Sequence, residues 1–221
     1  SHNLFEDNGI KFFNKDGQKF SAELEKRIET KLTQEMVAVE SINLGKASRM
    51  NDPQARYIDF CKSTFNSLDL NGLSILLDCA NGATYSVAPK VFSDLGARVE
   101  TIGSSPDGIN INQNCGSTSP NFLKEEIMKG SYDIGIAFDG DGDRILIINS
   151  DGKILDGDDI LYILSKNISP DTGVVGTLMT NKALELYFKK NDIPFLRAEV
   201  GDKYVLHKLI EKSWFLRGEP S

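Results

Sequence analysis

The stretch IAFDGDGDRILIIN, residues 136–149, joins two apolar runs through three aspartates that alternate with glycines. The first run predicts a buried strand, and its end places the loop at the carboxyl edge of a sheet, where α/β proteins usually hold their sites. The intervening glycines allow a tight fold, so the carboxylates of Asp139, Asp141 and Asp143 can converge. Converging carboxylates repel one another unless a cation lies among them, and Mg²⁺ suits such oxygen ligands. The stretch therefore predicts an α/β fold with a magnesium site.

Arg144 follows the aspartates directly, and its rigid fork of donors suits a phosphate oxygen. A solvated acidic turn is the simpler alternative, but three aspartates in strict alternation exceed what a turn requires. An EF-hand is excluded, because this loop lacks the Gly and Glu of its sixth and twelfth positions. A haloacid-dehalogenase-type phosphatase is the closer rival, although Asp143 replaces its small hydroxyl residue or valine. In the similar stretch LDGDD, 155–159, we interpret Asp156 or Asp158 as a helix cap.

Apolar runs and helical patterns alternate on both sides of the aspartate loop. The patterns predict strands over 73–79, 97–103 and 132–138, with helices over 87–95 and 120–129 between them. Beyond the loop they predict a hairpin turn at 151–152, helices over 158–166, 182–190 and 203–211, and strands over 173–178, 195–200 and 214–217. This alternation is typical of parallel α/β layers. We therefore predict two successive α/β domains that meet near Asp156.

The segment before these domains contains two predicted helices. Residues 21–35 form the first, with Ser21 as its N-cap and acidic residues in its first turn. The second covers 53–65 and has Pro in its first turn. Apolar residues recur every four positions in the first helix and predict a buried stripe, consisting of Leu24, Ile28 and Leu32.

Composition narrows the class of protein. The chain has 221 residues and a net charge of -7, which argues against nucleic acid as a partner. It has no apolar run of the length that a membrane span needs. The cysteines are three in number and widely spaced, so we interpret them as free thiols in a reducing, cytoplasmic compartment. The functional alternative is that one cysteine is a catalytic nucleophile, with His2 or His207 as its histidine partner.

Several motifs together resemble the α-D-phosphohexomutases. DGDGDR resembles the metal loop of that family, the segments SHN (1–3) and NGIK (8–11) its phosphoserine loop, and GEPS (218–221) the start of its sugar-binding loop, in the family's order. The resemblance spans residues 1–221. The stretches DNGIKFF, LGKASR, DCANGATY, GININQNCGST and VGDKYV are similar to the branch that interconverts glucosamine 6-phosphate and glucosamine 1-phosphate. The resemblance implies an isomerase that serves the UDP-N-acetylglucosamine and peptidoglycan precursor pathway.

The resemblance also implies roles for individual residues. Phosphorylated Ser1 would exchange its phosphoryl group with the sugar through a bisphosphorylated intermediate, and a sugar bisphosphate would act as activator. Ser1 and the three aspartates would bind one Mg²⁺, Arg144 would steady the phosphate, and Lys11 would be the general acid/base. The residues implied to shape the site and bind substrate are His2, Asn3, Gly201, Asp202, Lys203, Glu219 and Ser221. Taken alone, Lys11 could instead be a surface lysine and Asp202 a helix cap.

The same resemblance implies a domain organisation. We expect two domains with mixed sheets sandwiched by helices, preceded by the remnant of a similar first domain. The remnant would cover 1–52, the metal-binding domain 53–155 and an incomplete sugar-binding domain 156–221. Leu4 stands where the family usually has proline. We expect a fragment with little activity alone, whose parent could be a homodimer.

Three alternative functions stay open. Within the family, the substrate could be that of a phosphoglucomutase or phosphomannomutase. Outside it, a Mg²⁺-dependent phosphatase would release inorganic phosphate, and a degenerate binding module would bind metal or sugar phosphate without transferring a phosphoryl group.

Overall fold

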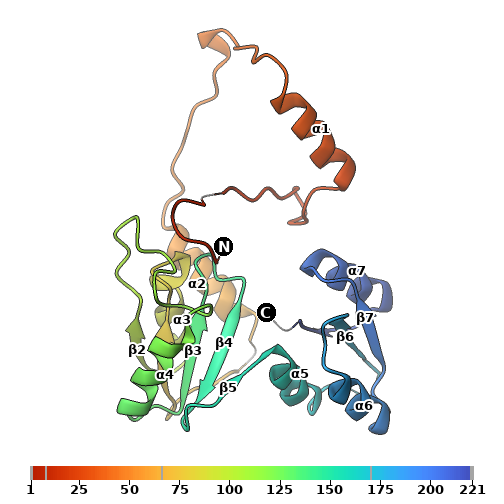
Figure 1. Cartoon of the computed structure of the whole chain (residues 1–221). Coiled ribbons are helices and arrows are strands. Elements are labelled where there is room, and N and C mark those ends of the chain that lie inside the picture. The colour runs from red at the N-terminus through yellow and green to blue at the C-terminus, as the bar shows by residue number, and fades with distance from the viewer. Residues whose placement is uncertain (1, 8, 66, 170, 220–221) are drawn as a thin grey trace. The chain divides into compact units, whose positions relative to one another are not determined.

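A computed structural model describes residues 2–7, 9–65, 67–169 and 171–219 (Figure 1). The chain divides into two compact units, one formed by Ser1–Asp7 with Gln54–Ser221 and the other by Asn8–Pro53. The larger unit contains two sheets with their helices. None of the helices in the described part of the chain has the length and apolar composition that crossing a membrane requires.

The first sheet has five strands in the order β2-β1-β3-β4-β5. Strands β1 (Ser74–Asp78), β2 (Arg98–Ile102) and β3 (Ile134–Phe138) run parallel, whereas β4 (Ile145–Asn149) and β5 (Ile154–Leu155) continue the sheet in antiparallel pairing. The hairpin turn predicted at 151–152 joins β4 to β5. In this turn the N–H of Gly152 donates to Asn149 O over 2.9 Å. The carboxyl ends of the three parallel strands therefore meet at one edge.

Helices cover both faces of this sheet. Alternate residues of β1 enter opposite cores: Ile75 and Leu77 pack with Ala88 of α3 (Ala88–Asp94), and Leu76 packs with Leu123 of α4 (Pro120–Lys129). An ion pair of 2.8 Å between Lys62 and Asp94 ties α2 (Pro53–Ser63) to α3. The predicted sandwich of helices around a mixed sheet is confirmed.

The second sheet has the order β7-β6-β8, with all pairings parallel in its described part. Its strands are β6 (Val174–Thr177), β7 (Phe195–Ala198) and β8 (Leu216–Arg217). One face packs against α5 (Gly157–Ser165) and α6 (Lys182–Lys190) through Leu161, Leu184 and Phe188, and the other against α7 (Asp202–Lys212) through Val205. Because the strands alternate with helices, their carboxyl ends also share one edge.

The smaller unit contains α1 (Ala22–Leu32), the 3₁₀ turn Ser41–Asn43 and an isolated bridge between Phe13 and Lys19. The predicted N-cap is confirmed, since Ser21 Oγ accepts from the N–H of Leu24 over 3.3 Å. The predicted buried stripe is wrong: no residue of α1 is buried, and Leu32 is 80% exposed. The described part of this unit supplies no second layer for the stripe to pack against.

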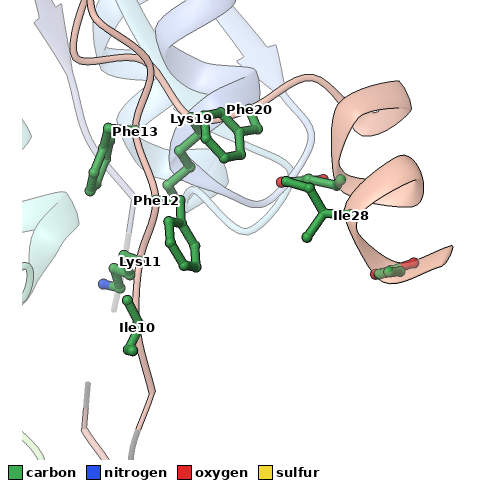
Figure 2. Close-up of a pocket in the computed structure, with 9 residues that line it drawn as sticks. Ile10, Lys11, Phe12, Phe13, Lys19, Phe20 and Ile28 are labelled. Carbon is green, nitrogen blue, oxygen red and sulfur yellow. The ribbon is translucent and has the colours of Figure 1, made fainter. Parts of the chain in front are cut away.

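A surface hollow of about 350 Å³ lies beside α1 in the smaller unit (Figure 2). The rings of Phe12 and Phe20 stack there with their centroids 6.2 Å apart. In Figure 2 the Phe12 ring lies on the α1 side of the backbone and the Lys11 amine on the other side. Lys11 is exposed and belongs to the lining of this hollow.

Candidate functional site

The three aspartates of the loop after β3 come together. One carboxylate oxygen from each of Asp139, Asp141 and Asp143 lies within 4.8 Å of the others. Asp139 is fully buried, whereas Asp141 and Asp143 are exposed. Three hard oxygen donors at this separation suit a small divalent cation, and the two exposed carboxylates leave it access to solvent and substrate. The donor set therefore fits Mg²⁺.

Local hydrogen bonds hold this loop in its curved form. The N–H of Gly142 donates to Asp139 O over 3.0 Å, and the N–H of Arg144 donates to Asp139 Oδ1 over 3.2 Å. Gly142 has a φ of +74°, a left-handed conformation that favours glycine. Arg144 thus contributes its backbone to the loop, and its side chain is half-buried.

The turn after β1 braces the aspartate loop from the side. The N–H of Ala83 donates to Gly140 O over 2.8 Å. A Cβ on Gly82 would lie 2.3 Å from that same oxygen, so the close approach requires glycine there. The NG pair in DCANGATY therefore serves the contact between these two loops.

Asp78, the last residue of β1, is a structural residue that the sequence reasoning missed. It is fully buried, and its two oxygens accept from the N–H groups of Ala80 (3.0 Å) and Gly116 (2.7 Å). The neighbouring N–H of Ser117 donates to Phe138 O over 2.8 Å, directly before the aspartate loop. Burial raises the pKa of Asp78 above its ordinary value, while the two backbone donors act in the opposite direction. Its only sequence signal was a charged residue ending an apolar run.

The cysteines are free thiols, as predicted. Burial raises the pKa of both Cys79 and Cys115 to about 11. A thiol in such surroundings stays protonated at neutral pH and is a poor nucleophile. The structure therefore argues against the cysteine-nucleophile alternative for these two positions.

The domain that contains the five-stranded sheet holds the N-terminal segment. The side-chain Nδ2 of Asn112 donates to Asn3 O over 2.7 Å. His2 and Asn3 are themselves exposed, and Ser1 lies outside the described residues. The predicted general acid/base, Lys11, belongs to the Asn8–Pro53 unit.

The second sheet brings the predicted substrate-binding segments together at its carboxyl edge. Gly201 has a φ of +124°, and its N–H donates to Glu219 Oε2 over 3.2 Å. Arg217 Nη1 donates to Asp202 O over 3.2 Å. Lys203 Nζ lies 5.1 Å from the ring centroid of Tyr204, and Ser221 lies outside the described residues.

Two helix starts settle earlier interpretations. Gly201 is the N-cap of α7 and Asp202 its first residue, so Asp202 is not the cap. Asp156 caps α5 in a reciprocal capping box with Asp159, as predicted for the LDGDD stretch. Asp158 instead accepts from the N–H of Asn181 over 2.8 Å.

Arg197 is a second residue that the sequence reasoning missed. Its Nη1 donates to the carbonyl oxygens of Thr177 (2.9 Å), Leu178 (3.2 Å) and Thr180 (2.8 Å). Its Nε and Nη2 both donate to Glu185 Oε2, at 3.0 and 2.8 Å. One guanidinium thereby fixes the turn that follows β6.

Comparison with protein families gives matches along most of the chain. Residues 1–38, 55–152 and 156–221 match the phosphoglucomutase/phosphomannomutase alpha/beta/alpha domains I, II and III. The whole chain is 54% identical to a phosphoglucosamine mutase of Pseudomonas entomophila and 53% identical to one of Cronobacter sakazakii, and covers 51% of each. The chain thus spans about half the length of the curated relatives it matches.

Solved structures share the fold at lower identity. A putative phosphomannomutase from Thermus thermophilus superposes with a TM-score of 0.74 over 93% of this chain and 48% of its own, at 18% identity. An N-acetylglucosamine-phosphate mutase of the α-D-phosphohexomutase superfamily superposes with a TM-score of 0.57 over 77% of this chain and 42% of its own, at 20% identity. These likenesses show a shared fold. The three domain matches and the 54% identity along the whole chain show that the chain belongs to the phosphoglucomutase/phosphomannomutase family of α-D-phosphohexomutases.

Proposed function

We propose that the intact protein interconverts glucosamine 6-phosphate and glucosamine 1-phosphate through a phosphoserine and a bisphosphorylated sugar. The observation that carries this proposal is the 54% identity to phosphoglucosamine mutases along the whole chain. The three carboxylates that converge after β3 support it, because moving a phosphoryl group requires its negative charge to be neutralised.

The proposed metal ligands are Asp139, Asp141 and Asp143, completed by an oxygen of phosphorylated Ser1. Mg²⁺ bound there would withdraw charge from the phosphoryl group. Arg144 would donate from its guanidinium to a phosphate oxygen. The backbone bonds that curve the loop keep the three carboxylates together before the cation arrives, which lowers the cost of binding it.

The other proposed residues act on the sugar and the proton. Lys11 would accept the proton of the attacking sugar hydroxyl at Nζ and pass it to the serine oxygen, which needs a proton once its phosphoryl group has left. In the reverse step the proton would move from the serine hydroxyl through the same Nζ to the sugar oxygen. His2 and Asn3 would shape the segment around Ser1. The substrate-binding residues would be Gly201, Asp202, Lys203, Glu219 and Ser221. The hydrogen bond between Gly201 and Glu219 supports a joint role for these two segments.

We further propose the domain boundaries 1–52, 53–155 and 156–221, which the three family matches support. The proposed setting is the cytoplasm, with a phosphosugar as the partner and neither nucleic acid nor membrane. A sugar bisphosphate is the proposed activator. A homodimer is the assembly to test, by light scattering on the intact protein.

The test begins with mass spectrometry of the whole, undigested protein. An adduct of about 80 Da on Ser1, followed by Mg²⁺-dependent formation of glucosamine 1-phosphate after priming with a sugar bisphosphate, is the expected result. Parallel assays on glucose and mannose phosphates identify the preferred substrate. Release of inorganic phosphate without an isomer would replace the mutase proposal with the phosphatase.

A further inference from the structure

A buried asparagine holds the segment that follows Ser1. Asn112 is 6% exposed, and its Nδ2 donates to Asn3 O over 2.7 Å. Asn3 lies two positions from the residue proposed to carry the phosphoryl group. Because the bond is to a backbone carbonyl, it fixes the path of the chain rather than one side chain.

Asn112 is itself fixed to the turn that braces the aspartate loop. Its N–H donates to Ala80 O over 2.9 Å, and the same turn donates the N–H of Ala83 to Gly140 O over 2.8 Å. A short path of hydrogen bonds therefore runs from Asn3 through Asn112 and this turn to the loop of the three aspartates. Asp78 stiffens the path, because it accepts from the N–H of Ala80.

The backbone at Asn112 explains why an asparagine serves here. Its φ is +57°, in the left-handed region that asparagine tolerates better than most residues. Asn114, two positions on, has almost the same φ of +56° but is exposed. The loop thus contains a natural control with the same backbone demand and a different environment.

We propose that Asn112 is a positioning residue. It holds the segment that follows Ser1, residues 2–7, in place relative to the loop of Asp139, Asp141 and Asp143. This inference rests on the proposed mutase function. Phosphoryl transfer requires the donor, the acceptor and the cation in near-attack geometry, so a small displacement of the donor segment lowers the rate of transfer. Asn112 does not belong to the proposed sugar-binding residues, so the affinity for the sugar phosphate depends on it much less.

The decisive variant is Asn112→Asp in the intact protein, with Asn114→Asp as the matched control. Aspartate keeps the size and tolerates the left-handed backbone, but its carboxylate cannot donate to Asn3 O. We expect kcat to fall about tenfold or more for Asn112→Asp, with little change in KM for the sugar phosphate. Asn114→Asp should stay within about twofold of the parent.

The pH profile separates positioning from general damage. A protonated carboxyl at position 112 can again donate to Asn3 O, so the ratio of variant to parent kcat should rise as the pH is lowered. A ratio that does not change with pH, together with a lowered melting temperature, would assign Asn112 a merely structural role. Equal kcat values for the two variants would also overturn the proposal.

Amide hydrogen exchange gives a readout that does not need activity. Exchange in the peptide covering residues 2–7 should quicken in Asn112→Asp and not in Asn114→Asp, while exchange in β3 stays unchanged. Unchanged exchange in residues 2–7 would refute the positioning contact. A parent protein that exchanges as expected but forms no isomer would instead refute the proposed function.

Discussion

The two sheets fix the loops at their carboxyl edges by opposite chemistry. At the first edge, a buried carboxylate, Asp78, collects two backbone N–H groups. At the second edge, a guanidinium, Arg197, collects three backbone carbonyl oxygens and pairs with Glu185. Each side chain matches the backbone groups that point toward it: Asp78 faces N–H donors at the first edge, and Arg197 faces carbonyl acceptors at the second.

This difference has a functional consequence. At the first edge, Asp78 holds loops that lie beside three further carboxylates, so this edge gathers negative charge that a bound cation would neutralise. The second edge already contains a cationic side chain, Arg197, and two of its segments are joined by the hydrogen bond from the Gly201 N–H to Glu219. The contrast predicts that the first edge depends on metal and the second does not.

The largest expected effect is at the aspartate loop. Asp141→Asn removes one anionic ligand without changing size, so we expect Mg²⁺-dependent isomerisation by the intact protein to fall by about a thousandfold. Mg²⁺ titration of the rate, with calorimetry of Mg²⁺ binding, checks it. Asp151→Asn, at an exposed position of the β4–β5 turn, is the control and should behave like the parent. Unaltered Mg²⁺ affinity in Asp141→Asn would remove the proposed contrast between the edges.

The next effect is on stability at the first edge. Asp78→Ala leaves the N–H groups of Ala80 and Gly116 buried without their acceptor, which should lower the free energy of unfolding by about 2–5 kcal/mol. Urea unfolding measures it. Glu125→Ala, an exposed carboxylate on α4, should change the free energy by less than about 0.5 kcal/mol. Equal midpoints for the two variants would contradict the bracing role of Asp78.

The sequence predicted the aspartate loop well, because its evidence was local. Two apolar runs defined the strands, the glycines allowed the turn, and strand direction placed Asp139 at the carboxyl edge. The convergence of the three carboxylates followed from neighbours within a few positions. For the same reason the capping role of Asp156 was predictable.

The braces were not predictable, because their partners are distant in sequence. Asp78 reaches Gly116, Asn112 reaches Asn3, and Arg197 reaches Thr177. A single chain contains no pattern that pairs such positions. The stripe of α1 failed for a related reason: periodicity identifies an apolar face but not the layer that covers it, and Leu32 is exposed.

A smaller effect is expected at the second edge. The guanidinium carbon of Arg197 lies 5.6 Å from the centroid of the Phe195 ring. Arg197→Met keeps a long apolar side chain at this position but removes the donors, so it should lower the free energy of unfolding by about 1–3 kcal/mol. Amide exchange should quicken after β6 and stay unchanged in the aspartate loop. Lys208→Met, which removes only an exposed ion pair with Glu211, should cost less than about 1 kcal/mol. Faster exchange in the aspartate loop would show that the braces are not independent.

The smallest expected effect concerns how stability depends on pH: the contributions of Asp78 at the first edge and Glu185 at the second should change in opposite directions as the pH rises. Burial raises the pKa of Asp78 above 3.8, so the folded state binds its proton more tightly, and the stability that Asp78 contributes falls as the pH rises from 3.8 through its folded pKa. Hydrogen bonds from Lys182 and Arg197 hold the pKa of Glu185 below 4.5, so its contribution is present above 4.5 and is lost as the pH falls through its folded pKa. Unfolding curves at several pH values should therefore show the parent losing stability relative to Asp78→Asn, and gaining it relative to Glu185→Gln, as the pH rises through this range. Slopes of the same sign for both comparisons would mean that burial does not dominate at Asp78, and that the backbone donors of Ala80 and Gly116 stabilise its carboxylate as effectively as the cations stabilise Glu185.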